Sequence, residues 1–164
     1  RTGLKIQRGQ EIPAGNYHLC VEIWIMGTDG KFLIQKRSAC KKVLPDIWGM
    51  TTGNALCGEN GREACVREAK EELGIVLSKE MLVPALYIFR EHTIWEVYFI
   101  RQDYDLSRAV LQEEEVSEAA WAGLDEIVRL LDRGEFYRYP EMDKMLEFAE
   151  QFQQGGRAPA VKMG

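Results

Sequence analysis

The sequence contains no run of roughly 20 consecutive apolar residues, the length that a membrane-spanning helix needs. Its first ten residues, RTGLKIQRGQ, have no apolar core of the kind found in a signal peptide. Positive charge is also scarce, because 21 Lys and Arg residues stand against 26 Asp and Glu residues, a net charge of −5. We therefore expect a cytoplasmic protein that binds neither a membrane nor a nucleic-acid polymer.

Cysteine and histidine are both scarce. The chain has four cysteines without a CxxC pair, namely Cys20, Cys40, Cys57 and Cys65. This spacing favours reduced structural thiols over disulfides or a zinc site. His18 and His92 are isolated in the sequence, which favours core or surface roles over catalysis.

The length and composition favour one folded domain. A chain of 164 residues with 46% hydrophobic residues can bury a single core of ordinary size. We assign residues 1–154 to this domain. The remaining residues, 155–164, belong to the segment QQGGRAPAVKMG and are expected to form a flexible tail. The protein is expected to be a monomer or a homodimer.

Hydrophobic periodicity predicts interleaved strands and helices. Five segments are rich in β-branched and aromatic residues and are bounded by turn signals: 17–26, 32–35, 85–89, 94–100 and 116–121. Three segments have helical patterns with end signals: 61–73, 124–133 and 140–152. Because no regular βαβ alternation is present, we predict an α/β fold with a mixed sheet that helices cover on its faces.

The long stretch 38–59 has little regular pattern. It contains the turn formers Pro45 and Gly49, and loops of this length in compact domains are usually functional. Trp48, in this stretch, and Trp95 could stack on a base, although large aromatic side chains more often belong to a core.

The segment NGREACVREAKEELGI, residues 60–75, carries the signals of a complete helix. Asn60 followed by Glu63 is a start signal, and Gly74 is a stop signal. At 100° per residue, one face of this helix is apolar and the opposite face is acidic. The sequence therefore predicts one face in the core and one acidic face.

Three carboxylates belong to the acidic side: Glu68, Glu71 and Glu72. Their i, i+3 and i+4 spacing places them on consecutive turns, where like charges repel. Two explanations fit this pattern. The face is solvated and ion-paired, with Arg67 and Lys70 as partners, or it binds a hard cation such as Mg²⁺, which takes carboxylate, water and phosphate oxygens as ligands.

The spacing of residues from Gly53 to Ile75 favours the second explanation, in which the acidic face binds a cation. From Gly53 the chain reads GNALCGENGREACVREAKEELGI, which is Gly, five residues, Glu, seven residues, Arg-Glu, two residues, Glu-Glu, one residue, Gly and an apolar residue. Seven identities at set spacing arise by chance about once in a million chains of this length. The segment resembles the Nudix box of the MutT-like Nudix hydrolases, with Ala69 where the family usually has a bulkier aliphatic residue. A looser resemblance covers residues 17–131.

The resemblance implies an α/β/α sandwich with a mixed central β-sheet and a loop–helix–loop metal site. In this family the site holds a divalent metal, Mg²⁺ or Mn²⁺, against a small-molecule diphosphate, while water attacks phosphorus and cleaves a nucleoside diphosphate linked to another group. The resemblance implies that the metal ligands are Glu68, Glu71 and Glu72. Four further residues of the box orient the loop and the helix: Gly53, Glu59, Arg67 and Gly74. Among these, Arg67 and Glu59 are expected to form an ion pair.

The resemblance leaves the general base open, since relatives take it either from the box or from another glutamate. The candidates are Glu68, the acidic run 113–115 and Glu96. We favour Glu115, and the catalytic carboxylates are then Glu68, Glu71 and Glu115. A solvated acidic loop would give the same sequence pattern as a run that contains the base.

A cationic cluster flanks the expected phosphate position: Lys36, Arg37, Lys41 and Lys42. We predict Arg37 and Lys42 as substrate contacts. A solvated sheet edge is the alternative interpretation of the same cluster.

Two other functions remain alternatives. The segments YHLCVEIWI and KKVLPDIWGMTTGNALCGE also resemble the isopentenyl-diphosphate-isomerase-like branch, in which the enzymes carry a catalytic Cys and a metal-binding His at the positions of Thr52 and Asn54. Protonation of an alkene needs both groups and hydrolysis needs neither, so hydrolysis is favoured. A catalytically inactive binding module is also less favoured, because the box carboxylates are all present. The group attached to the diphosphate is left open.

Overall fold

The computed structural model describes residues 6, 7, 9–156 and 161–163. This part of the chain contains eight strands and three α-helices, with short 3-10 turns at Lys79–Met81 and Leu106–Arg108. The strands are β1 (His18–Met26), β2 (Phe32–Arg37), β3 (Trp48–Gly49), β4 (Thr51–Asn54), β5 (Val83–Phe89), β6 (Thr93–Arg101), β7 (Val116–Ala122) and β8 (Val161–Met163). The helices are α1 (Gly61–Leu73), α2 (Leu124–Asp132) and α3 (Met142–Gln153).

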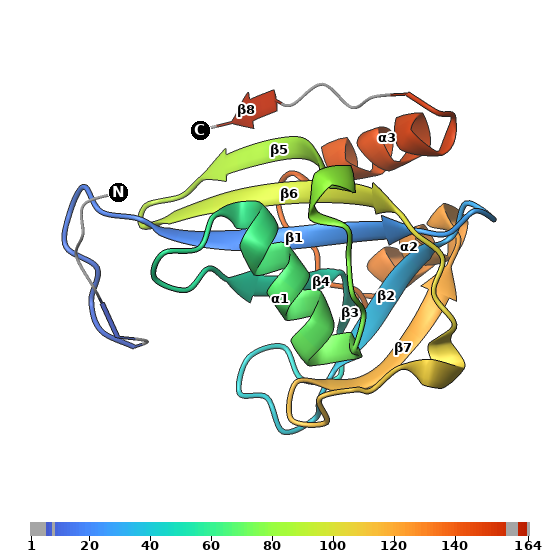
Figure 1. Cartoon of the computed structure of the whole chain (residues 1–164), viewed down its shortest axis with the longest axis horizontal. Helices are drawn as coiled ribbons and strands as arrows, with labels where there is room; N and C mark the ends of the chain where they lie inside the picture. The colour runs from blue at the N-terminus through green and yellow to red at the C-terminus, as the bar shows by residue number, and fades with distance from the viewer. Residues whose placement is uncertain (1–5, 8, 157–160, 164) are drawn as a thin grey trace.

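The strands form one mixed sheet in the order β3-β2-β1-β6-β5-β8, with β4 also paired to β1 and β7 to β2 (Figure 1). The central pair, β1 and β6, is parallel along its whole length, whereas β5 and β6 form an antiparallel hairpin. Only Met26 and Phe32 pair between β1 and β2, and the strands then diverge. Strand β4 pairs with β1 along Cys20–Ile23 instead, which places the start of the predicted box beside the central strand.

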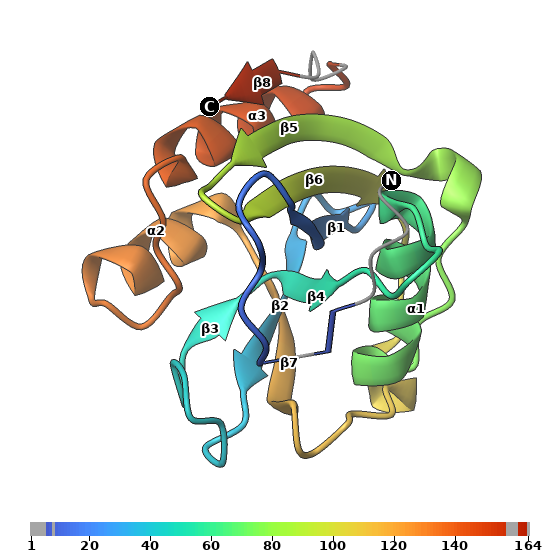
Figure 2. The same ribbon diagram turned by 90° about the vertical axis from the view of Figure 1, so that its left-hand side faces the viewer.

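The sheet lies between two helical layers (Figure 2). Alternation along β1 sends Val21 and Ile23 to the face that α1 covers, where they pack with Ala69 and Leu73. Trp24 and Met26 point to the opposite face, which α2 and α3 cover. The structure thus confirms the predicted α/β/α arrangement with a mixed sheet.

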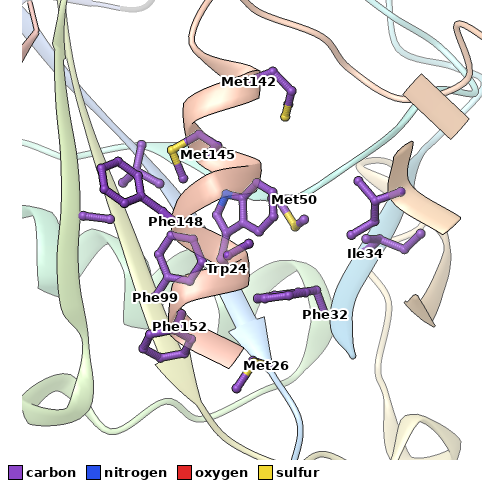
Figure 3. Close-up of a cluster of buried hydrophobic side chains, with 14 of the residues drawn as sticks. Trp24, Met26, Phe32, Ile34, Met50, Phe99, Met142, Met145, Phe148 and Phe152 are labelled. Atoms are coloured by element: carbon purple, nitrogen blue, oxygen red, sulfur yellow. The ribbon is translucent and has the colours of Figure 1, made fainter. Parts of the chain in front are cut away.

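Aromatic side chains dominate the core beneath α3 (Figure 3). Trp24 stacks on Phe99 with ring centroids 5.3 Å apart, and Phe32 meets Trp24 edge-on at 5.4 Å. Phe152, from the last turn of α3, packs on Phe99 at 5.1 Å. Such pairs contribute stability beyond the area that they bury, so they fix α3 against the sheet.

Two predicted irregular segments contain strands. The stretch 38–59 includes β3 and β4, which are only two and four residues long and are too short for a period of two to be visible in the sequence. The expected tail 155–164 includes β8, whose Val161 pairs in parallel register with Leu86 of β5. The loose-tail prediction is therefore wrong for 161–163, and the rest of that tail beyond 156 lies outside the described residues. Among the residues that the structure describes, no helix is long and apolar enough to cross a bilayer.

Candidate active site

Helix α1 has both ends fixed by local contacts. The side chain of Asn60 accepts a hydrogen bond from the Glu63 backbone N–H at 3.1 Å, and the Glu63 carboxylate accepts one from the Asn60 N–H at 2.9 Å. At the other end, Gly74 adopts a left-handed conformation with φ 73° and donates to the carbonyl of Lys70. These caps set which carboxylates face the sheet.

Arg67 joins the helix to the loop before it. Its guanidinium donates to Glu59 through Nε at 2.9 Å and through Nη2 at 3.1 Å, and Nη2 also donates to the carbonyl of Asn54 at 2.7 Å. The planar guanidinium group of arginine can make such a bidentate contact, whereas the ammonium group of lysine cannot. The structure thus contains the ion pair that the resemblance implies.

The same guanidinium contacts two of the three predicted metal ligands. Nη1 of Arg67 lies 2.8 Å from Oε2 of Glu71 and 3.0 Å from Oε1 of Glu68. Part of the repulsion expected among the acidic residues is therefore offset within the chain. Glu71 is half exposed, with 52% of its side chain accessible.

Glu68 lies against β4 at Gly53. A Cβ atom built on Gly53 would be 2.0 Å from Cδ of Glu68, so any side chain at this position would displace the carboxylate. Burial raises the pKa of Glu68, and the charge of Arg67 opposes that rise. A glycine is required at position 53 because the carboxylate of Glu68 approaches the backbone too closely for any side chain.

Glu72 is the most buried of the three box carboxylates, with 7% of the residue exposed. Gln35 of β2 donates to Oε2 of Glu72 at 2.6 Å, and Oε1 of Gln35 accepts from the Thr51 hydroxyl at 3.0 Å. Burial, together with the negative charges of Glu68 and Glu115, raises the pKa of Glu72 to about 7, although the hydrogen bond from Gln35 acts in the opposite direction. A carboxylate that is buried among like charges is stabilised when a cation binds beside it.

Glu115, the favoured base, immediately precedes β7 and lies close enough to Glu72 to act on its charge. Lys41 contacts Glu115 with Nζ 2.6 Å from Oε2. Lys42, which was predicted as a substrate contact, is exposed, and its neighbour Lys41 is the lysine that reaches the site. The sequence could not separate these two adjacent lysines.

Arg37 lines the same cavity as Gln35 and also donates from Nε to the carbonyl of Val43 at 3.2 Å. Glu96, the other candidate base, lies at the opposite end of α1, where a Cβ on Gly61 would be 1.9 Å from its Oε2. Its carboxylate accepts from the Tyr98 hydroxyl at 2.6 Å. Glu115 therefore lies near the buried carboxylate of Glu72, whereas Glu96 lies at the other end of α1.

The described residues contain no group of three His, Cys, Asp or Glu side chains that converge to hold a metal ion. Glu71 is engaged by Arg67, and Glu115 is engaged by Lys41. The donor set nevertheless fits a hard cation in its chemistry, because burial disfavours the charged forms of Glu68 and Glu72, and the charge of Glu68 further disfavours the charged form of Glu72.

A cavity of about 180 Å³ lies beside Gln35 and Arg37. Gln35, the donor to Glu72, and Thr52, which precedes Gly53, both line it. Its wall includes five aromatic side chains, namely Trp48, Trp95, Phe136, Tyr137 and Tyr139. Gln35 therefore connects the cavity with the carboxylate of Glu72.

Comparisons with known proteins identify the family. A family model described as the NUDIX domain matches residues 16–144. The chain is 34% identical over 139 residues to an uncharacterized Nudix hydrolase from Listeria monocytogenes, covering 84% of this chain and 82% of that protein. It is also 26% identical over 155 residues to an isopentenyl-diphosphate Delta-isomerase from Citrobacter koseri, covering 84% and 83% of the two chains. The chain belongs to the Nudix hydrolase family, as the spacing of its box predicts.

Solved structures share this fold. A NUDIX hydrolase from Nitrosomonas europaea superposes with a TM-score of 0.71 at 15% identity, covering 98% of this chain and 92% of that one. A second, DR0079 from Deinococcus radiodurans, superposes with a TM-score of 0.68 at 20% identity, covering 88% and 90%. The agreement extends over nearly the whole chain, which supports the fold described above.

Proposed function

We propose that this protein is a divalent-metal-dependent hydrolase that cleaves the diphosphate bond of a nucleoside diphosphate linked to another group. The observation that carries the proposal is the environment of Glu72. This buried carboxylate accepts a hydrogen bond from Gln35, which lines a cavity, and the negative charges of Glu68 and Glu115 act on it. Clustered buried carboxylates are costly unless a cation offsets them, and a diphosphate is the substrate class that brings its own oxygens to that cation.

Glu68, Glu71 and Glu72 would hold Mg²⁺ or Mn²⁺. The contact of Glu71 with Arg67 at 2.8 Å requires that Glu71 share or release this ion pair when it binds the cation. Because Gly53 has no side chain, the carboxylate of Glu68 can occupy the space beside it. The hydrogen bond from Gln35 fixes the rotamer of Glu72. When bound, the cation supplies charge neutralisation and polarises the phosphoryl oxygens.

The chain's own residues would handle the proton and the substrate charge. Glu115 accepts a proton from the attacking water as the new O–P bond forms and the P–O bond of the anhydride breaks, which releases two phosphoryl products. Lys41, 2.6 Å from Glu115, holds this carboxylate in place. Arg37, at the wall of the cavity, contacts the phosphate, whereas Lys42 in the exposed loop would make only an outer contact.

The geometry of the site does not support the alternative reaction, isomerisation of isopentenyl diphosphate. Thr52 lines the cavity where an isomerase would need a thiol, and the side-chain oxygen of Asn54 accepts from Cys20 Sγ at 2.9 Å. A threonine hydroxyl is too weak an acid to protonate an alkene. We therefore retain hydrolysis as the proposed reaction.

The experiment is a panel of nucleoside diphosphates linked to sugars, nucleotides or alcohols, incubated with Mg²⁺ or Mn²⁺ in ¹⁸O-labelled water. We expect metal-dependent cleavage of at least one class, with one ¹⁸O atom in a phosphoryl product. Cleavage with the label only in the released alcohol or sugar would contradict attack on phosphorus, and no cleavage of any class would contradict the proposed reaction.

A further inference from the structure

Buried polar side chains form a connected chain that ends at one of the box carboxylates. Among the described residues, five polar or charged residues are buried: Glu22, Gln35, Ser38, Thr51 and Glu72. Glu22 accepts hydrogen bonds from Trp24 and Tyr139. Three of the others are joined to one another, because Thr51 donates to Gln35 and Gln35 donates to Glu72. Thr51 has no part in the hydrolytic mechanism proposed above.

Thr51 lies where the chain crosses from one strand of the sheet to another. Trp48 and Gly49 of β3 pair with β2, and Thr51 of β4 then pairs with Ile23 of β1. Strand β2 shares only one residue pair with β1 and diverges from it. The hydrogen bond from Thr51 to Gln35 therefore bridges β4 and β2, two strands that have no backbone pairing with each other in the described part of the chain.

The two ends of the Gln35 amide have different partners. Nε2 donates to Oε2 of Glu72 at 2.6 Å, and Oε1 accepts from the Thr51 hydroxyl at 3.0 Å. A rotation of the amide by half a turn would place Oε1 against the Glu72 carboxylate, where two acceptors repel. Because Thr51 is 1% exposed and Gln35 is 5% exposed, bulk water cannot readily replace the hydroxyl as the donor to Oε1. The hydroxyl thus holds the amide with its N–H toward Glu72.

Strand β4 acts on two carboxylates of α1, which lies beside it (Figure 2). Thr51 and Gly53 are two residues apart on the strand and share a face, and Glu68 and Glu72 are one turn apart on the helix. Gly53 leaves space for the carboxylate of Glu68, whereas Thr51 reaches Glu72 through Gln35. One four-residue strand therefore determines the positions of both buried carboxylates.

We propose that Thr51 is a positioning residue for the cation site, which acts through Gln35 to hold the Glu72 carboxylate in the orientation that binds a divalent cation. The assignment rests on the proposed function, because it takes Glu72 as a metal ligand. A ligand whose rotamer is fixed in advance loses less conformational freedom when the cation binds. Removal of an outer hydrogen-bond partner of a metal ligand typically costs about 10- to 100-fold in metal affinity or activity.

The first test measures Mn²⁺ affinity without substrate, from the electron paramagnetic resonance signal of free Mn²⁺. Thr51→Val replaces the hydroxyl with a methyl group of similar volume and leaves Oε1 of Gln35 without its donor. This variant should bind Mn²⁺ about tenfold more weakly than wild type. Thr51→Ser keeps the hydroxyl and should stay within about threefold of wild type. Equal affinities of Thr51→Val and wild type would overturn the assignment.

A double-variant cycle tests whether Thr51 acts through Gln35. Gln35→Met removes both amide hydrogen bonds at similar length, and it should lower Mn²⁺ affinity by about tenfold or more. In the Gln35→Met background, Thr51→Val should cause no further loss. Independent, additive losses would overturn the coupling. Gln35→Met also serves if Thr51→Val does not fold, since an unchanged Mn²⁺ affinity in Gln35→Met alone would overturn the assignment.

The control removes a hydroxyl hydrogen bond elsewhere in the chain. Thr28, in the turn between β1 and β2, donates to the carboxylate of Asp103. Thr28→Val should leave Mn²⁺ affinity unchanged, and affinities are compared at a temperature below the Tm of every variant. A loss in Thr28→Val equal to that in Thr51→Val would show a general effect of destabilisation and would overturn the positioning role.

Kinetics separate this assignment from the proposed hydrolysis. With a cleaved substrate, Thr51→Val should need about tenfold more Mg²⁺ for half-maximal rate, while the substrate KM at saturating Mg²⁺ stays within about threefold of wild type. An unchanged Mg²⁺ requirement in an active enzyme would overturn the role of Thr51 alone. Weaker Mn²⁺ binding by Thr51→Val, in a protein whose wild type cleaves no diphosphate, would support the role of Thr51 and contradict the proposed reaction.

Discussion

The carboxylate of Glu68 occupies the space where a side chain at position 53 would begin. A Cβ atom on Gly53 would lie 2.0 Å from Cδ and 2.1 Å from Oε1 of Glu68. Helix α1 and strand β4 therefore meet at a residue pair in which one member must be glycine for the other to keep its position.

Gly53→Ala should lower kcat about a hundredfold by displacing Glu68, since a misplacement of about 1 Å can cost that much. The measurement is kcat and Tm for Gly53→Ala, Glu68→Ala and the double variant. If Gly53 acts through Glu68, the alanine at position 53 costs no further activity in the Glu68→Ala background. Additive losses would contradict this coupling.

Arg67→Lys should lower activity about tenfold and Tm by several degrees. A lysine keeps the charge but cannot contact both oxygens of Glu59, the Asn54 carbonyl and Glu71 together. Arg129→Lys is the matched control, because Arg129 forms an exposed i, i+4 pair with Asp125 on α2. Equal effects of the two substitutions would show that the guanidinium fork has no special role.

The pH dependence of stability without metal should identify Glu72. Its folded-state pKa is raised to about 7, so folding favours the protonated form, and this contribution is fully present below about pH 4.5 and is lost as the pH rises through 7. In EDTA, wild type should therefore lose about 3 kcal/mol more than Glu72→Gln between these limits. Chemical denaturation at pH 5 and pH 8 measures this difference, and parallel profiles would contradict it.

Thr52→Cys should not create isopentenyl diphosphate isomerase activity. Isomerisation needs a proton donor and an acceptor on opposite faces of the alkene in a pocket that excludes water, and the thiol supplies one of these. The measurement is deuterium incorporation into isopentenyl diphosphate from heavy water with Mg²⁺. Incorporation by wild type above the no-enzyme control would reverse the ranking of hydrolysis over isomerisation.

Helix α1 could be predicted closely because its determinants are local. Asn60, Glu63 and Gly74 form the caps that the sequence signals indicate, and the helix spans Gly61–Leu73 as predicted. The hairpin of β5 and β6 likewise follows from two adjacent strand patterns and a short turn. The first predicted hairpin shares only one residue pair, because β4 replaces β2 as the partner of β1.

Two contacts that complete the site could not be predicted, because they join residues that are distant in the sequence. Gln35 contacts Glu72 across 37 positions, and Lys41 contacts Glu115 across 74. One signal for Glu22 was present in the sequence, since it lies in the otherwise apolar run VEIWIM. A lone acidic residue in such a run indicates a buried carboxyl, but only the fold brings Tyr139 and the cavity to it.

The central claim, that the α1 carboxylates hold a catalytic divalent cation, is tested most directly by Glu72→Gln. Turnover of a cleaved substrate with Mg²⁺, and Tm with EDTA and with Mg²⁺ at pH 8, are measured for this variant and for wild type. The account predicts a loss of kcat of at least a hundredfold, a Tm in EDTA that equals or exceeds that of wild type, and no rise of Tm on adding Mg²⁺. Full activity per folded molecule, with a lower Tm in EDTA, would show that Glu72 is structural and would contradict the account.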